Sequence, residues 1–302
     1  MPPFMTAAEL AAFECDGFVT VQTGIPALLL AEAAAAMIAG SPPPDPEKKS
    51  YRTSMGTDSP EIVEVPAFRA ILEHPSIVAC AMEVLDTAAV EVFQVSPLVA
   101  FPQPPTDRGA ASGHRFHSDT ELAPADFAAT PRRLTCEMFI WLVDVPAGRA
   151  NLTVHAGSHT RNMAAWAAQD GAAEYPRIVG HREDELPPPP GGWAAAAPVA
   201  VEAVAGQVTV LTTAVTHSAS DNLDNSPRVV LNPSFVAREF LMRLPANQAA
   251  KKVGRQPICH EHCHCAAAGG WAVLMHSVHA VNRVHALLAL AMSPPECSDL
   301  EV

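Results

Sequence analysis

The chain has 302 residues, of which 49% are hydrophobic and 17% are charged, a balance that excludes a disordered or fibrous protein. Its 32 acidic and 19 basic side chains give a formal net charge of -13, which disfavours nucleic acid and anionic membrane surfaces as partners. The length suits one large domain or two small ones.

The N-terminal residues predict a helix followed by a strand. Thr6 is a suitable helix cap and Gly17 a suitable stop, so we expect a helix over residues 6–17. The β-branched run 18–21 predicts a short strand directly after it.

Three further segments complete the N-terminal third of the chain. Residues 27–40 are rich in alanine and predict a second helix. Residues 41–60 begin with four prolines in six positions, and we expect a long exposed loop there that serves as a lid or binding loop. Residues 62–85 predict a helix in two pieces, because Pro75 should break it.

The middle of the chain consists of short β-branched runs separated by turns. Because no long helix interrupts them, we expect antiparallel sheets in a sandwich or barrel, hence a mainly β fold with flanking helices. Residues 181–193 are charged and proline-rich, and should form a surface excursion over the mouth of the barrel. The strands are expected at 90–101, 133–145, 151–157, 199–204, 207–215 and 228–238.

The first candidate site residues are His117 and Asp119, in the segment GHRFHSDTE. Residues two apart in an extended segment point to the same face, so both side chains can reach one ion. Chance alone gives roughly half a His-x-Asp pair in a chain of this composition. On the pair alone, a turn histidine and a loop-capping aspartate are the favoured interpretation.

His217 changes that balance, because it lies near the end of the strand-rich region, in QVTVLTTAVTHSASDN. Two imidazoles and one carboxylate on one face of an octahedral ion leave three adjacent positions open, as in non-haem Fe(II) oxygenases. Zinc hydrolases also combine three protein ligands with an open position. The ligand set alone therefore leaves both kinds of enzyme open.

Arg228 lies on the next expected strand, in SPRVVLNPSF. Its guanidinium could hold a carboxylate through two parallel hydrogen bonds. Beside an open metal site it would suit the far end of a dicarboxylate such as 2-oxoglutarate. Viewed alone, an arginine paired with Asp221, Asp224 or solvent is the favoured interpretation.

Taken in order, these motifs resemble those of the phytanoyl-CoA dioxygenase family of Fe(II)/2-oxoglutarate oxygenases. They are the helix and strand ELAAFECDGFVTV, the HSD pair, the strand and turn GRANLTVHAGSH, and then His217 and Arg228. The resemblance extends over residues 6–240. Each motif is loose, but four of them in the expected order are specific.

The resemblance implies a double-stranded β-helix core (jelly roll, cupin-like) with helices before it. In that fold His117, Asp119 and His217 would hold Fe(II), and no catalytic residue is expected beyond these metal ligands. The carboxylate at Asp119 argues against halogenation, since halogenating relatives lack it and use the vacancy for halide.

The resemblance also implies cosubstrates and their contacts. Arg228 would bind 2-oxoglutarate, with Gln94 and Thr135 as further cosubstrate contacts. O2 is the other cosubstrate, and the resemblance allows ascorbate as an accessory cofactor. The chain departs from the family pattern at Ala156, at Gln207 and in the segment VFQVSPLVAF, where many members carry a lysine.

The implied reaction is hydroxylation of an aliphatic C–H bond of a small molecule, acyl- or lipid-like or a specialised metabolite, with release of succinate and CO2. A zinc or manganese hydrolase or isomerase on the same barrel would have no use for Arg228. A catalytically silent barrel would act as a binding module.

Basic side chains occur in loops 41–60, 106–116 and 181–193, Arg52 among them, and could bind an acidic substrate. Solvated loop charge is the favoured interpretation for most of them.

The C-terminal part has a different composition, so we expect an oxygenase domain over 1–250 and a separate segment over 251–302. Residues 259–265, CHEHCHC, could bind Zn²⁺ or Cu(I), but they lack the second ligand pair of a structural zinc site. The amphipathic helix that follows would pack on the barrel or on another subunit, and the oligomeric state stays open.

The sequence also bears on location. Its start has no signal-peptide pattern and its end no peroxisomal tripeptide, so we expect a cytoplasmic protein. The most apolar stretch, residues 271–292, is interrupted by histidines and Arg283 and is a poor membrane span.

Overall fold

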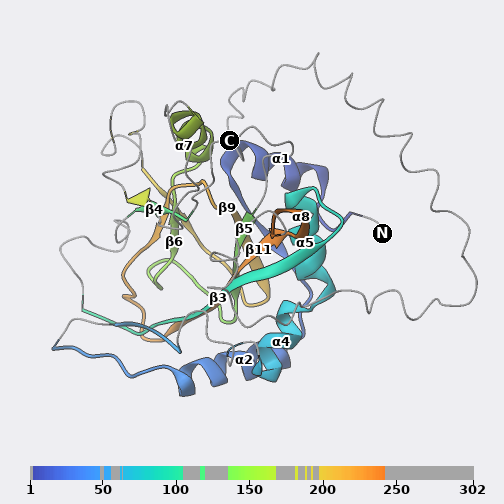
Figure 1. The fold of residues 1–302 in the computed structure, drawn as a ribbon. Helices are drawn as coiled ribbons and strands as arrows, with labels where there is room; N and C mark the ends of the chain where they lie inside the picture. Colours follow the sequence, from blue (N-terminus) through green and yellow to red (C-terminus); the bar gives the residue numbers. More distant parts are fainter. Residues whose placement is uncertain are drawn as a thin grey trace, which may run out of the picture. The chain divides into compact units, whose positions relative to one another are not determined.

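The computed structural model describes residues 3–47, 51–55, 62, 64–104, 116–119, 135–167, 181–182, 188, 192 and 197–241. In this part of the chain, two antiparallel sheets form a mainly β fold, as Figure 1 shows. The expected double-stranded β-helix with flanking helices is therefore confirmed. The larger sheet has the order β1 (Phe18–Gln22), β9 (Gln207–Thr212), β5 (Thr135–Trp141), β11 (Arg228–Ala237), β3 (Val90–Ala100), β2 (Arg52–Ser54). The smaller has the order β7 (His181–Arg182), β4 (His117–Ser118), β10 (His217–Ala219), β6 (Leu152–Val154), β8 (Val199–Val201).

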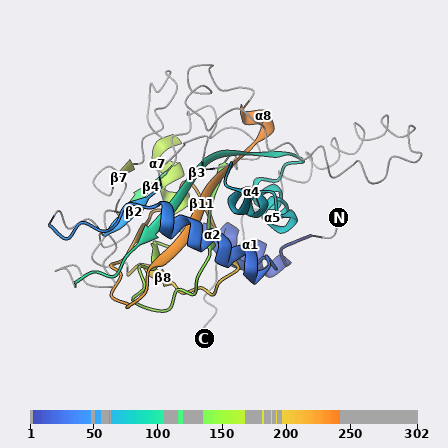
Figure 2. The same cartoon turned by 90° about the horizontal axis from the view of Figure 1, so that it is seen from below.

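Helices cover one face of the larger sheet. They are α1 (Ala7–Asp16), α2 (Ala27–Gly40), α4 (Pro66–Leu72) and α5 (Pro75–Leu85), and α2 and α5 contact both β3 and β11. In Figure 2 these helices lie on one side of β3 and β11, while β4 and β7 lie on the other. The helix–sheet–sheet layering leaves the space between the two sheets for a site.

The helix ends follow the signals in the sequence. The Thr6 hydroxyl accepts a hydrogen bond from the Glu9 backbone N–H, and the Glu9 side chain accepts one from the Thr6 N–H, so a capping box starts α1. Gly17 ends α1 in the left-handed conformation. Pro75 occupies the first turn of α5, where its missing N–H costs no hydrogen bond, and it separates α5 from α4 as expected.

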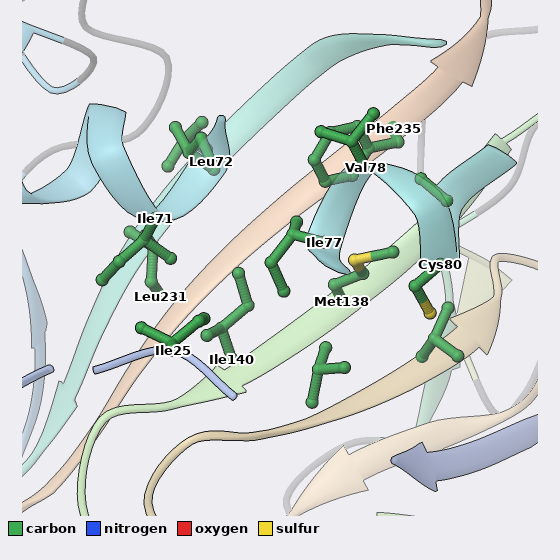
Figure 3. Close-up of a cluster of buried hydrophobic side chains, with 14 of the residues drawn as sticks. Ile25, Ile71, Leu72, Ile77, Val78, Cys80, Met138, Ile140, Leu231 and Phe235 are labelled. Carbon is green, nitrogen blue, oxygen red and sulfur yellow. The ribbon is translucent and has the colours of Figure 1, made fainter. Parts of the chain in front are cut away.

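Alternation along the central strands divides the core into two layers. On β5, Met138 and Ile140 belong to the cluster beneath the helices, whereas Phe139 and Trp141 belong to the cluster between the sheets. Figure 3 shows the first cluster, with side chains of α4 and α5 packed over those of β5 and β11. The face of the larger sheet that carries Phe139 therefore looks toward the smaller sheet.

Two strands differ from the sequence-based expectations. Residues 52–54 form strand β2 at the edge of the larger sheet, although we expected residues 41–60 to be entirely irregular. The proline run ends at Pro46, so the backbone beyond it can take part in a sheet. Residues 181–182 form β7 and pair with β4 rather than only crossing the surface.

A further helix, α7 (Ser158–Ala167), was not expected, and a short one, α8 (Arg238–Leu241), follows β11. Residues 251–302, with the Cys/His cluster and the expected C-terminal helix, lie outside the described residues. Among the helices that are described, none is long and apolar enough to span a membrane.

Candidate metal centre

Two neighbouring strands bring the three candidate ligands together. His117 on β4 and His217 on β10 are directly paired in register. Asp119 follows β4, and its backbone N–H donates to the Thr213 carbonyl at 3.0 Å, which holds the residue beside β10. One ligand atom from each of the three side chains lies within 4.8 Å of the other two. The convergence predicted from residues far apart in the sequence is present.

The orientation of His217 suits metal binding. Its Nδ1 lies 3.2 Å from the Val215 carbonyl, which can only accept, so the neutral ring carries its proton on Nδ1 and presents the Nε2 lone pair. That Nε2 lies 3.2 Å from Asp119 Oδ2, and His117 Nε2 lies 3.5 Å from Asp119 Oδ1. An octahedral ion with bonds of about 2.1 Å separates adjacent ligand atoms by about 3 Å.

Burial and charge are consistent with a cation at this place. Asp119 Oδ2 is buried and has no hydrogen-bond partner within the described part of the chain. Burial alone would raise the pKa of the Asp119 carboxyl, but the attraction of His217 outweighs it and holds that pKa below its usual range. Burial likewise opposes the charging of His217, and the nearby Asp119 reverses this and raises the pKa of the imidazole. An orphaned carboxylate oxygen beside two imidazoles fits a divalent ion.

Glu137 is a fourth polar side chain here that the sequence analysis missed. It lies on β5, is only 8% exposed, and its Oε2 is 3.9 Å from His217 Nε2. Oε2 is also buried without a hydrogen-bond partner among the described residues. Burial, and then the charge on Asp119, raise the pKa of Glu137 well above its ordinary value. Without a cation this shift keeps the Glu137 side chain protonated, and a divalent ion at the centre would favour its ionised form.

A cavity of about 330 Å³ extends from this centre between the sheets. His117 and His217 line it together with Phe139, and Arg228 lines it as well. Arg228 is 3% exposed, and its Nε has no hydrogen-bond partner among the described residues. Burial, and then the charge of Arg52, lower the pKa of Arg228 to about 9. Asp224, one of the partners favoured for Arg228 when that arginine is viewed alone, is instead paired with Arg149 at 2.9 Å.

Arg52 is a second arginine on the same cavity. One of its Nη atoms donates to the Ala219 carbonyl at 2.9 Å and also to the Ser220 carbonyl, at the end of the strand that carries His217. Burial lowers the pKa of Arg52 to about 10, against an opposing contribution from Asp221. The expectation of solvated loop charge is therefore wrong for this residue.

The other predicted contacts lie further along the strands. Gln94 on β3 pairs with Ser234 on β11, and Ser234 lies six positions along that strand from Arg228. Thr135 begins β5, and its hydroxyl lies 3.0 Å from that of Thr213. Neither residue is among those that line the cavity, and their roles stay predictions. His159 Nε2 lies 3.2 Å from the Glu14 carbonyl, so this histidine contacts helix α1.

The profile of the phytanoyl-CoA dioxygenase family matches residues 13–230, which is most of the chain. The chain belongs to the phytanoyl-CoA dioxygenase family. A search of curated protein sequences found no match.

Solved structures of related proteins share the fold. The epimerase SnoN in complex with Fe3+, alpha ketoglutarate and nogalamycin RO is 21% identical, with a TM-score of 0.54 over 76% of this chain and 82% of that one. The carbocyclase SnoK from nogalamycin biosynthesis is 19% identical, with a TM-score of 0.54 over 80% of this chain and 91% of that one. EctD from S. alaskensis with bound Fe is 16% identical, with a TM-score of 0.52 over 78% of each chain.

Proposed function

We propose that the protein is an Fe(II)/2-oxoglutarate-dependent oxygenase that hydroxylates an aliphatic C–H bond of a small molecule, acyl- or lipid-like or a specialised metabolite. One observation carries the proposal: the His117, Asp119 and His217 set and the buried guanidinium of Arg228 open on the same cavity. A hydrolase or isomerase with a similar metal set would have no use for that guanidinium. Membership of a dioxygenase family supports the same conclusion.

In this proposal the three side chains hold the iron, and the remaining positions stay open for cosubstrates. With iron and 2-oxoglutarate bound, the site supplies O2 activation coupled to oxidative decarboxylation of the keto acid to succinate and CO2. The Val215 carbonyl fixes the tautomer of His217, and the negative charge of Asp119 balances part of the charge of the ion.

The residues between the metal ligands and Arg228 determine what can enter. Arg228 provides a carboxylate site in a buried place, where a charge-assisted hydrogen bond is strong. Leu98, Val99 and Phe139 give the cavity apolar walls, which keep water from the reacting atoms. The chain thus supplies orientation, charge balance and exclusion of water.

The named reactions of the structural relatives show which products to look for. SnoN is an epimerase and SnoK a carbocyclase. Hydroxylation adds one oxygen atom to the substrate, epimerisation leaves its mass unchanged, and ring closure removes two hydrogen atoms. Mass spectrometry of products from a small-molecule library, with succinate measured in parallel, separates these outcomes.

The test of the proposed function is anaerobic addition of Fe(II) and then 2-oxoglutarate, watching for the visible charge-transfer band of a keto acid chelated to iron. Arg228→Ala should weaken 2-oxoglutarate binding about 30-fold or more, because it removes one partner of a buried charge pair, while metal content stays nearly unchanged. Arg238→Ala is the matched control, since Arg238 follows the other end of β11 and pairs with Glu91. A protein that binds the metal but gives no band would favour a non-oxidative metal enzyme, and one that binds neither would favour a binding module.

A further inference from the structure

Arg52 and Arg228 stand in register across strand β3. The Cα partner of Arg52 in the β2–β3 pairing is Ala100, and the Cα partner of Arg228 in the β11–β3 pairing is the same Ala100. Residues directly opposite one another in neighbouring antiparallel strands point to the same face of a sheet. Both arginines therefore project from the face that looks toward the metal centre, and both line its cavity.

The residue between them leaves room for their side chains. Two strand spacings separate the backbones of Arg52 and Arg228 by about 10 Å, a gap that two arginine side chains can close. Ala100 contributes only a methyl group at this position. Strand β3 itself carries no lysine or arginine, so the positive charge here comes from the strands on either side of it.

The charges around Arg52 and Arg228 are unbalanced. Burial, and then the charge of Arg52, lower the pKa of Arg228, so the two guanidinium groups lie close enough to repel each other. No ion pair to a carboxylate is found for either arginine in the described part of the chain, although Asp221 lies near enough to Arg52 to raise its pKa. The buried Arg228 and the partly buried Arg52 beside one aspartate leave a net positive charge, which an anionic ligand would neutralise.

Arg52 is also held in place before any ligand binds. The Ala219 and Ser220 carbonyls accept from one end of its guanidinium, and they follow His217 on β10. These contacts fix the guanidinium on the side of the cavity that also carries a metal ligand. A cation fixed in this way loses little freedom when it binds a carboxylate.

We propose that Arg52 and Arg228 together bind the distal carboxylate of the keto-acid cosubstrate, with Arg52 as its second cationic contact. This inference rests on the proposed function, because it assumes that 2-oxoglutarate is the ligand of the cavity. It assigns Arg52, from a segment expected to be an irregular loop, to cosubstrate selection. The two guanidiniums select a keto acid with a second carboxylate over one without it.

The test compares two keto acids of equal chain length, 2-oxoglutarate and 2-oxopentanoate, which differ in the distal carboxylate. Anaerobic titrations of the Fe(II) protein give a dissociation constant for each. Arg52→Gln should weaken 2-oxoglutarate binding about 10- to 100-fold, the usual contribution of a hydrogen bond to a charged group, and should leave 2-oxopentanoate binding within about twofold. Arg52→Lys, which keeps a cation that can reach the same carbonyls, should give a smaller loss.

Two other results of these titrations would overturn the inference, and a third would overturn the proposed function. Equal weakening of both keto acids would show that Arg52 acts only on the architecture of the cavity, and an unchanged 2-oxoglutarate affinity would show that it makes no contact with the cosubstrate; either result overturns the inference. In both cases a normal loss in Arg228→Ala would leave the proposed function intact. If the unaltered protein binds neither keto acid, the proposed function itself fails. Arg69→Gln is the control, because Arg69 is an exposed helix residue paired with Glu73.

Discussion

Glu137 Oε2 lies 3.9 Å from Nε2 of His217, so a second buried carboxylate faces the candidate metal centre beside Asp119. In the ionised form that a nearby cation favours, its charge would stabilise a divalent ion held by the three ligands, whether or not it binds the ion directly. Glu137→Gln keeps the size of the side chain and removes the charge. We expect this variant to bind Mn(II), used as a spectroscopic substitute for Fe(II), about tenfold more weakly in an electron paramagnetic resonance titration.

Glu91→Gln is the control for that experiment, since Glu91 pairs with Arg238. The control should bind Mn(II) as the unaltered protein does. Equal affinities in Glu137→Gln and the unaltered protein would contradict an electrostatic role for Glu137 at the centre.

Removal of a metal ligand should lower the metal affinity more than removal of a neighbouring charge does. His217→Ala is expected to lower Fe(II) affinity by more than about 100-fold, because the substitution deletes one of three protein ligands. Metal content after equilibrium dialysis measures this loss. His155→Ala is a suitable comparison, since His155 is also a buried histidine, near Phe116 rather than in the ligand group. Equal metal loss in both variants would mean that the fold, and not the ligand set, had failed.

The turn between α1 and β1 is expected to be less stable with any residue other than glycine at position 17. Gly17 has a φ of 81°, and a Cβ there would lie 2.5 Å from Nδ1 of the buried His159 ring. Gly17→Ala should reduce the free energy of unfolding by about 1–3 kcal/mol, from backbone strain together with displacement of that ring. Urea denaturation gives the value. Gly148 has a similar φ but open space around it, so Gly148→Ala should reduce the free energy of unfolding by a smaller amount.

Buried thiols should make the protein less stable in alkali. Burial raises the pKa of Cys80 to about 12, whereas an unfolded cysteine titrates near 8.5. Above that pH the unfolded chain has released a proton that the folded chain retains, so the free energy of unfolding falls as the pH rises toward 12. For Cys80 the loss by pH 10 is about 2 kcal/mol.

The measurement compares denaturation at pH 7.5 and pH 10. Cys80→Ala should lose about 2 kcal/mol less over this range than the unaltered protein does, even though the cavity it creates lowers its stability at both values. An identical pH dependence in the two proteins would exclude Cys80 as its source.

Local signals in the sequence were sufficient to predict the helices that precede the barrel. The Thr6 cap, the Gly17 stop and the Pro75 break act within one or two turns of the chain, and each is found where it was expected. Helix α7 escaped notice because the residues after Ser158 are mostly polar or small, so the segment lacks the apolar content of the predicted helices.

The site depended on pairings between distant strands, which a sequence alone does not reveal. Motif order was enough to select His117, Asp119 and His217, but the register that places Arg52 opposite Ala100 could not be deduced from residues 41–60. Glu137 did leave a signal, because a carboxylate within the apolar run TCEMFIW has to be compensated in the folded protein.

The two-residue strand β4 has one further consequence. It meets β10 through a single register pair, His117 with His217. An ion bound by both imidazoles in the folded chain only would stabilise the fold by mass action, by about 2.7 kcal/mol at a free concentration 100 times its dissociation constant. Iron would then hold β4 against β10 as well as take part in the reaction, and its binding would raise the thermal stability of the protein.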